Sequence, residues 1–311
     1  MLSRVADSLY WMSRYFERAD NASRVVEATY GLILNPAKFS SDERWFHAVS
    51  SLARGTTSTN LDPQHALFLL VADPEGVFSI MKCIGGAREN ARQVREEISS
   101  EMWEHLNRLF HEVTRSQLDP DDDAGAMRVV SLIREGSYRF HGITDTTMNH
   151  GEGWHFIQLG KYIERACNLS ILLDAYFSID KHADDLDWVG LLTSCAAFEA
   201  YCKACTAELK PERIAGFILL EADFPYSVRY SLDRMHQALT SISNLSLSRR
   251  TGKIERLIGR LRSVVTYAQI GEVIRGDLHK YLAGIIEQCR DLHAAVHQVY
   301  IDYPMEVVLE A

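Results

Sequence analysis

Apolar residues recur at intervals of three and four along nearly the whole chain, and no run alternates apolar and polar positions over the length of a strand. This spacing is typical of amphipathic helices packed on a core, so the sequence predicts an all-α, multi-helix bundle. The expected helices lie at about residues 2–33, 43–54, 63–71, 75–98, 101–116, 124–147, 153–178, 186–208, 211–221, 226–243, 249–274 and 277–301.

A nine-residue motif occurs twice, as YFERADNAS from Tyr15 to Ser23 and as YIERACNLS from Tyr162 to Ser170, with six of nine positions identical. Landmarks follow both copies in the same order, at offsets of 147, 143 and 151 residues for the motif, a tryptophan and a Pro-x-x-Val sequence. The landmarks are Trp45 and Trp188, then Pro74 to Val77 and Pro225 to Val228. We therefore predict two duplicated helical units, 1–147 and 148–311, packed as one body, with an extra C-terminal helix in the second.

The motif helix has two distinct faces. One is apolar from Leu9 through Phe16 to Val26, and its Ala19 and Ser23 are small enough for close helix packing. The other carries aromatic and ionisable residues, and its candidate binding residues are Arg14, Glu17, Arg18 and Asn21, with Glu164, Arg165 and Asn168 in the second copy. Two interpretations stay open: buried ion-pair networks that fix helix register, or a cleft in which arginine clamps a carboxylate or phosphate.

A second candidate anion site lies on the predicted helix 75–98. Arg88, Arg92 and Arg95 are spaced so that three guanidinium groups would lie along one helix face, with Glu89 and Asn90 beside them. The alternative is a solvent-exposed face on which these arginines pair with neighbouring glutamates.

Composition and charge exclude some classes of protein but do not identify the function. The 311 residues carry a net charge of −9, with 47% hydrophobic and 24% charged residues, which suits a folded protein and argues against general nucleic-acid binding. No apolar run approaches a membrane span, and residues 1–10 lack the basic and apolar blocks of a signal peptide. We expect a cytoplasmic chain that begins at Met1 and has no membrane segment.

The potential metal and nucleotide motifs are incomplete. Cys202 and Cys205 form a single C-x-x-C without a second pair, so we expect six reduced thiols and no metal site. His293 and His297 lack the glutamate of a zinc-protease motif and are expected at a surface or interface. A glycine-rich phosphate loop is also lacking from the sequence, so we expect no bound cofactor.

Several stretches together resemble one known family. They are MLSRVADSLYWMSRYFERADN (1–21), ARENARQVREEISSEMWEHLN (87–107), HGITDTTM (141–148) and GWHFIQLGKYIERA (153–166). They resemble the Alpha-E family, a bacterial all-helical family of unassigned activity named for its Glu-Arg motif, and the resemblance covers essentially the whole chain. It also places Arg88, Glu89, Asn90 and Arg92 among the candidate binding residues.

The resemblance implies a partner protein. Members of the family are associated with circularly permuted ATP-grasp proteins, and often with transglutaminase-like proteins, which suggests ATP-dependent amide-bond formation on peptides or amino acids. We expect this chain to bind a peptide or a small carboxylate ligand as a separate partner of such a ligase. The alternatives are an enzyme in which Glu17 or Glu164 is a general acid or base, and a scaffold in which the Glu-Arg pairs are structural.

Overall fold

The computed structural model describes residues 1–34, 40–52, 65–73, 79–178, 184–206, 208–246 and 252–301. Within these ranges the chain is all-α, as the periodicity predicts, and contains no strand. The first seven helices are α1 (Ser3–Ile33), α2 (Ser41–Leu52), α3 (Ala66–Ala72), α4 (Ile80–Gln93), α5 (Ser100–Arg115), α6 (Asp123–Thr147) and α7 (Glu152–Ser178). The others are α8 (Asp185–Ser194), α9 (Phe198–Cys205), α10 (Pro211–Leu220), α11 (Val228–Ser246), α12 (Gly252–Thr266), α13 (Ile270–Gly276) and α14 (Leu278–Val296), which continues as a π-helical turn, η2 (His297–Ile301).

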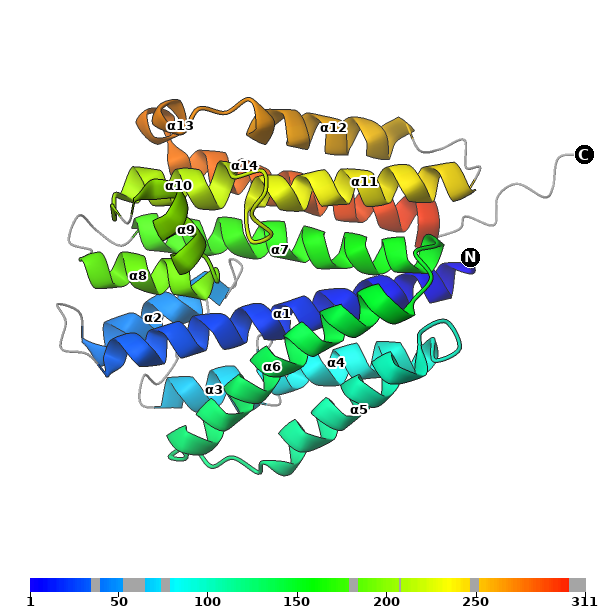
Figure 1. The fold of residues 1–311 in the computed structure, drawn as a ribbon, viewed down its shortest axis with the longest axis horizontal. Helices are drawn as coiled ribbons and strands as arrows, with labels where there is room; N and C mark the ends of the chain where they lie inside the picture. Colours follow the sequence, from blue (N-terminus) through cyan, green and yellow to red (C-terminus); the bar gives the residue numbers. More distant parts are fainter. Residues whose placement is uncertain are drawn as a thin grey trace, which may run out of the picture.

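The two long helices α1 and α7 lie side by side at the centre and run in the same direction (Figure 1). Helices α3 to α6 lie on the α1 side, where α4 and α6 pack on α1 and α5 covers both. Helices α10 to α14 lie on the α7 side, where α11 and α14 pack on α7 and α12 covers both. Because each central helix packs against several neighbours, much of its polar face is buried as well as its apolar face.

That double burial explains the composition of α1. The apolar seam residues Leu9, Phe16 and Val26 are fully buried, as expected, but Glu17 and Arg14 on the opposite face are also almost inaccessible to solvent. The buried polar groups of this helix therefore need partners inside the protein.

The central helices approach each other closely at Gly160. A β-carbon there would lie 2.3 Å from the backbone oxygen of Tyr10, a distance that no side chain tolerates. Next to it, the hydroxyl of Ser13 donates a hydrogen bond of 2.7 Å to the carbonyl of Ile157. This contact fixes the register of α1 against α7 and so positions the motif residues one to two turns further along.

Two predicted helices are each divided in the structure. The expected helix 186–208 is broken between α8 and α9, where Ala196 has a positive φ of 51°. The expected helix 249–274 is broken between α12 and α13. Both segments keep the helical period on either side of the break, so the pattern of apolar residues alone does not reveal the turn.

The internal duplication stays a prediction. The landmark tryptophans Trp45 and Trp188 lie in α2 and α8 and are both buried. Pro74 and Val77 lie outside the described residues, whereas Pro225 lies in the turn before α11. In the described ranges, no helix has a stretch that is both long and apolar enough to cross a membrane.

Candidate functional site

The two copies of the Glu-Arg motif meet and exchange partners. Arg165 of α7 donates from Nε and Nη2 to the two carboxylate oxygens of Glu17 on α1, at 2.5 and 2.9 Å. In return Arg18 of α1 donates from Nε and Nη2 to the two carboxylate oxygens of Glu164 on α7, at 2.5 and 3.4 Å. Both glutamates are buried, so two forked ion pairs join the central helices in the interior. We call this group of four residues the crossed Glu-Arg centre.

A third arginine completes one side of the centre. Nε of Arg14 donates to Glu164 at 2.8 Å, while its Nη1 lies 3.3 Å from the hydroxyl of Tyr10 and 3.0 Å from Nδ1 of His293. A guanidinium group can only donate, so Nδ1 of His293 must be an unprotonated acceptor. Burial and the adjacent Arg14 favour a neutral ring, since they lower the pKa of His293 to about 3.

The other side of the centre is covered by the turn before α11. The ring of Tyr226 stacks on the guanidinium of Arg165 at 3.9 Å, and the carbonyl of Pro225 accepts a hydrogen bond from Nη1 of Arg165 at 3.2 Å. The hydroxyl of Tyr226 donates to Asp20 at 2.9 Å, and Asp20 also accepts from Nε of Arg24 at 3.0 Å. The network therefore extends from the crossed centre along α1 to a second buried ion pair.

The pKa shifts of Arg165 and Asp20 favour the charged form of each side chain. Burial alone would lower the pKa of Arg165, but the carboxylate of Glu17 raises it above its ordinary value. Burial would raise the pKa of Asp20, but Arg24 and Arg165 lower it overall. Each charge is thus held by its partner, which is the condition for a buried ion pair to persist.

Two further ionisable residues lie beside Glu17. Nε2 of His141 on α6 is 3.8 Å from the Glu17 carboxylate, and burial together with Lys161 and Arg165 holds the pKa of His141 well below its usual range. Lys161 on α7 is half-buried, and burial and Arg165 lower its pKa to about 8. Lys161 forms no ion pair with any residue that the structure describes.

The remaining motif candidates lie on the same two helices. Asn21 is half-buried on α1, and Asn168 is buried on α7. The structure thus brings Arg14, Glu17 and Arg18 together with their counterparts at 164 and 165, as the repeated motif suggested.

The second candidate set does not join this centre. Nε of Arg88 donates to Asn107 of α5 at 2.8 Å, and Asn90 donates to the carbonyl of Gly86 at 2.8 Å. Arg92 forms an exposed ion pair with Glu89 three residues earlier, which is the solvent-exposed alternative.

The expected row of three guanidinium groups on one helix face is wrong. Helix α4 ends at Gln93, and Arg95 lies beyond it in the turn to α5, where its guanidinium stacks 5.1 Å from the ring of Trp103.

Sequence reasoning missed several members of the network, among them Asp20, Arg24 and Tyr226. The Asp20 and Arg24 pair could have been found from its i, i+4 spacing on a helix. His293 was expected at a surface or interface, and it lies instead at the edge of the crossed centre with its ring stacked on Tyr10.

The cysteines and metal-ligand types do not form a further site in the described ranges. All six cysteines are free, and four of them are buried. Groups of three or more His, Cys, Asp or Glu side chains arranged to hold a metal ion are lacking among the residues described.

The fold and the crossed centre together define an all-helical domain built around a Glu-Arg motif shared by two central helices. The chain belongs to the Alpha-E family, described as a predicted alpha-helical domain with a conserved ER motif, which it matches over residues 1–301.

The chain is also similar to uncharacterised curated proteins of mycobacteria. A protein of Mycobacterium bovis and two of Mycobacterium tuberculosis are each 25% identical to it over 319 aligned positions, which cover 93% of this chain. The matched region is 36% of each relative, so the chain spans about a third of their length. No solved structure matches the chain.

Proposed function

We propose that this chain is a helical partner of a circularly permuted ATP-grasp ligase and helps it to form amide bonds on a carboxylate-bearing or peptide substrate. Membership of the Alpha-E family supports the partnership through the family's association with such ligases, and a transglutaminase-like protein belongs to the same proposal. The mycobacterial relatives support it further, because this region is only about a third of their length and therefore works beside a larger remainder. The proposal places the chain in the cytoplasm, where ATP is available.

The single observation that carries the proposed role is that the oxygens of both motif carboxylates already accept hydrogen bonds from arginines. Each of Glu17 and Glu164 accepts hydrogen bonds from guanidinium groups on both of its oxygens. A general acid or base needs a carboxylate oxygen within hydrogen-bond reach of substrate. The geometry therefore favours a structural role for the crossed centre, and a partner role for the chain, over an enzyme that uses these glutamates.

Substrate contact is better assigned to Lys161, which holds the same place on α7 as Arg14 holds on α1, 147 residues earlier. Arg14 reaches Glu164, whereas Lys161 makes no ion pair in the described part of the chain. A half-buried amine beside Arg165 and His141 is a favourable contact for a ligand carboxylate, because the ligand supplies the missing negative charge.

The test combines this chain with an ATP-grasp protein encoded in the same genome. We expect the two to elute together from a sizing column, and ADP release in the presence of amino acids or peptides to rise when this chain is added. Lys161→Met should reduce the rise without preventing complex formation, and Lys280→Met, at an exposed position on α14, should change neither. ADP release that is the same with and without the chain, and no complex, would refute the partnership.

The two parts of the proposal can fail separately. If the complex forms and Lys161→Met stimulates ADP release as strongly as the unaltered chain, the partnership stands and the substrate role of Lys161 is wrong. Turnover of substrate by the purified chain alone would instead support the rival interpretation as an enzyme.

A further inference from the structure

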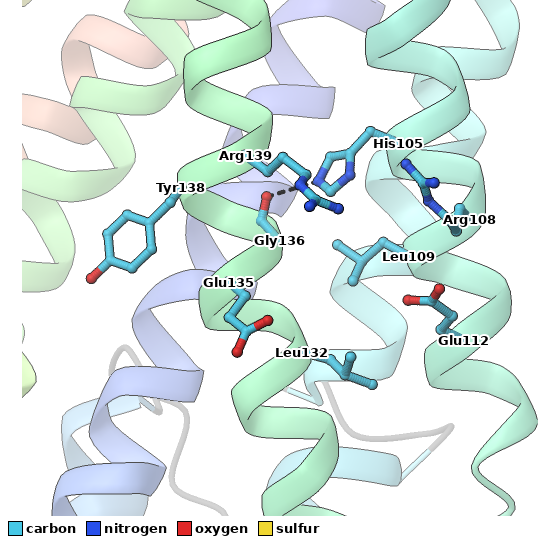
Figure 2. Close-up of a pocket in the computed structure, with 9 residues that line it drawn as sticks. All are labelled: His105, Arg108, Leu109, Glu112, Leu132, Glu135, Gly136, Tyr138 and Arg139. Atoms are coloured by element: carbon cyan, nitrogen blue, oxygen red, sulfur yellow. Dashed lines mark hydrogen bonds between the residues drawn. The ribbon is translucent and has the colours of Figure 1, made fainter.

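An open cavity lies between α5 and α6, on the outer part of the α1 side (Figure 2). Its volume is about 560 Å³, within the range of small-molecule sites. Leu109 of α5 and Leu132 of α6 form an apolar floor, and charged side chains surround it.

The charges around the cavity are separated by sign. Arg108 and Glu112 are four residues apart on α5, and Glu135 and Arg139 are four residues apart on α6. Because α5 and α6 run in opposite directions, both arginines lie at the His105 end and both glutamates lie about one turn further along (Figure 2). Four residues correspond to about 6 Å along a helix axis, so a positive end and a negative end face the same small space.

These four charged residues form no ion pair with any side chain in the described part of the molecule, although each has an i, i+4 neighbour of opposite sign. All four are exposed, so their charged groups are accessible to a ligand.

A buried histidine adds a second observation. His105 lines the cavity and is only 4% exposed, and its Nε2 lies 2.8 Å from the carbonyl oxygen of Gly136. A carbonyl oxygen can only accept, so Nε2 carries the proton and Nδ1 is a bare acceptor. Nδ1 is buried and has no hydrogen-bond partner in the part of the chain that is described. His105 therefore places a neutral ring at the arginine end of the cavity, where its Nδ1 can report on charge that binds nearby.

We propose that the α5–α6 cavity binds a free, zwitterionic α-amino acid with an aliphatic side chain. The carboxylate binds Arg108 and Arg139, which can donate in a forked arrangement. The ammonium group faces Glu112 and Glu135, and the aliphatic side chain packs on the leucine floor. A simple anion would leave the two glutamates unpaired, and a simple cation would leave the two arginines unpaired.

The site is independent of the proposed ligase partnership, because it requires only the isolated chain. Failure to bind an amino acid would refute this inference and leave the partnership untouched. Failure to stimulate a ligase would leave the cavity's ligand unchanged.

The experiment is a titration of the full chain with L-leucine. Calorimetry measures the affinity, and the ¹⁵N NMR signals of the histidine rings report on the cavity. N-acetyl-L-leucine lacks the ammonium charge and L-leucinamide lacks the carboxylate, so each should bind about tenfold more weakly, or worse, than leucine. A leucyl dipeptide distinguishes the free amino acid from a peptide terminus and should also bind more weakly. On binding leucine, the Nδ1 signal of one histidine should shift, and His105→Gln should remove that signal.

Variants at the arginine end of the cavity test the proposed carboxylate contact. The double variant Arg108→Gln, Arg139→Gln should bind leucine about tenfold more weakly, or worse, and should lose the preference for leucine over leucinamide. Arg115→Gln, at an exposed position on the same helix outside the cavity, should leave binding unchanged. Equal binding of leucine and N-acetyl-leucine, tighter binding of inorganic phosphate, or equal weakening by Arg115→Gln would each overturn the proposal.

Discussion

Neutralising Glu17 tests whether the crossed centre stabilises the fold. In Glu17→Gln the shape of the side chain is retained, but Arg165 loses its anionic partner while its own side chain stays only 3% exposed. The amide has one acceptor oxygen, so one of the two donors that now bind Glu17, at 2.5 and 2.9 Å, loses its acceptor. Removing one partner of a buried pair costs about 3–5 kcal/mol, because the remaining charge is left uncompensated.

The assay is urea unfolding at pH 7, followed by circular dichroism, with Glu89→Gln as the matched control. Glu89 makes the same kind of carboxylate pair, with Arg92, but both side chains are about half exposed, so no measurable change is expected there. A second variant, Glu17→Gln with Arg165→Gln, removes both charges and should lose less stability than the sum of the two single losses.

The outcome that refutes the reasoning is specific. If Glu17→Gln unfolds at the same urea concentration as the unaltered chain and as Glu89→Gln, the crossed centre does not stabilise the fold. The two glutamates would then again be candidates for substrate contact or proton transfer.

Three further predictions follow from the same helices. Gly160→Ala should destabilise the chain by about 1–3 kcal/mol in thermal melts, because its β-carbon meets backbone at 2.3 Å, whereas Gly142→Ala, with open space around it, should not; equal melts would contradict this. Burial lowers the pKa of Lys161 from 10.5 to about 8, so between these pH values the unfolded chain keeps a proton that the folded chain has released, and this group makes stability rise with pH. Lys161→Met should therefore stabilise by about 1–3 kcal/mol at pH 7 and have no effect by pH 10.5; a difference in unfolding free energy that does not change with pH would show that the pKa is unshifted. Tyr226→Phe should cost about 1 kcal/mol or more in urea unfolding, because Asp20 loses a buried donor, and no loss would show that water replaces it.

The fold class follows from the sequence because helical periodicity is a local property. The residues that break the period, such as Ala196 with its positive φ, are ordinary helix formers by type. Their backbone conformation is imposed by tertiary packing, so the division of α8 from α9 could not be predicted from composition or spacing.

The motif residues were identified from repetition, but their partners could not be. A glutamate next to an arginine on one helix cannot pair with it well, because adjacent residues point about 100° apart. The partner of Glu17 is Arg165, 148 residues away, and that pairing depends on the close approach of α1 and α7 at Gly160. Sequence alone therefore left both burial and binding open as explanations for the same residues.

The side chains that complete the network come from two further helices and a turn. His141 lies on α6, His293 on α14, and Tyr226 in the turn before α11. A lone histidine or tyrosine has no pattern that marks it as a neighbour of a buried charge. Only the arrangement of the helices around α1 and α7 brings these groups to the centre.

The exchange of partners at the crossed centre bears on the predicted duplication. Glu17 contacts Arg165 and Arg18 contacts Glu164, which is the reciprocal pattern produced when two equivalent helices face each other across a two-fold axis. The serines that begin the flanking helices favour the same relation, since Ser79 precedes α4 and Ser227 precedes α11, 148 residues later. An alignment on these serines also matches Phe78 with Tyr226. Its offset of 148 residues is closer to the motif offset of 147 than the offset of 151 between the Pro-x-x-Val landmarks.

If the two helices are equivalent, the places where they differ become informative. Arg14 fills one side of the centre, reaching Glu164 and His293, whereas the corresponding residue on α7 is Lys161, beside His141. A structural lock alone would be served by arginine on both sides, since guanidinium is the better partner for a buried carboxylate. Lys161 forms no ion pair in the described part of the chain, and the proposed ligand contact rests on this asymmetry rather than on the Glu-Arg pairs themselves.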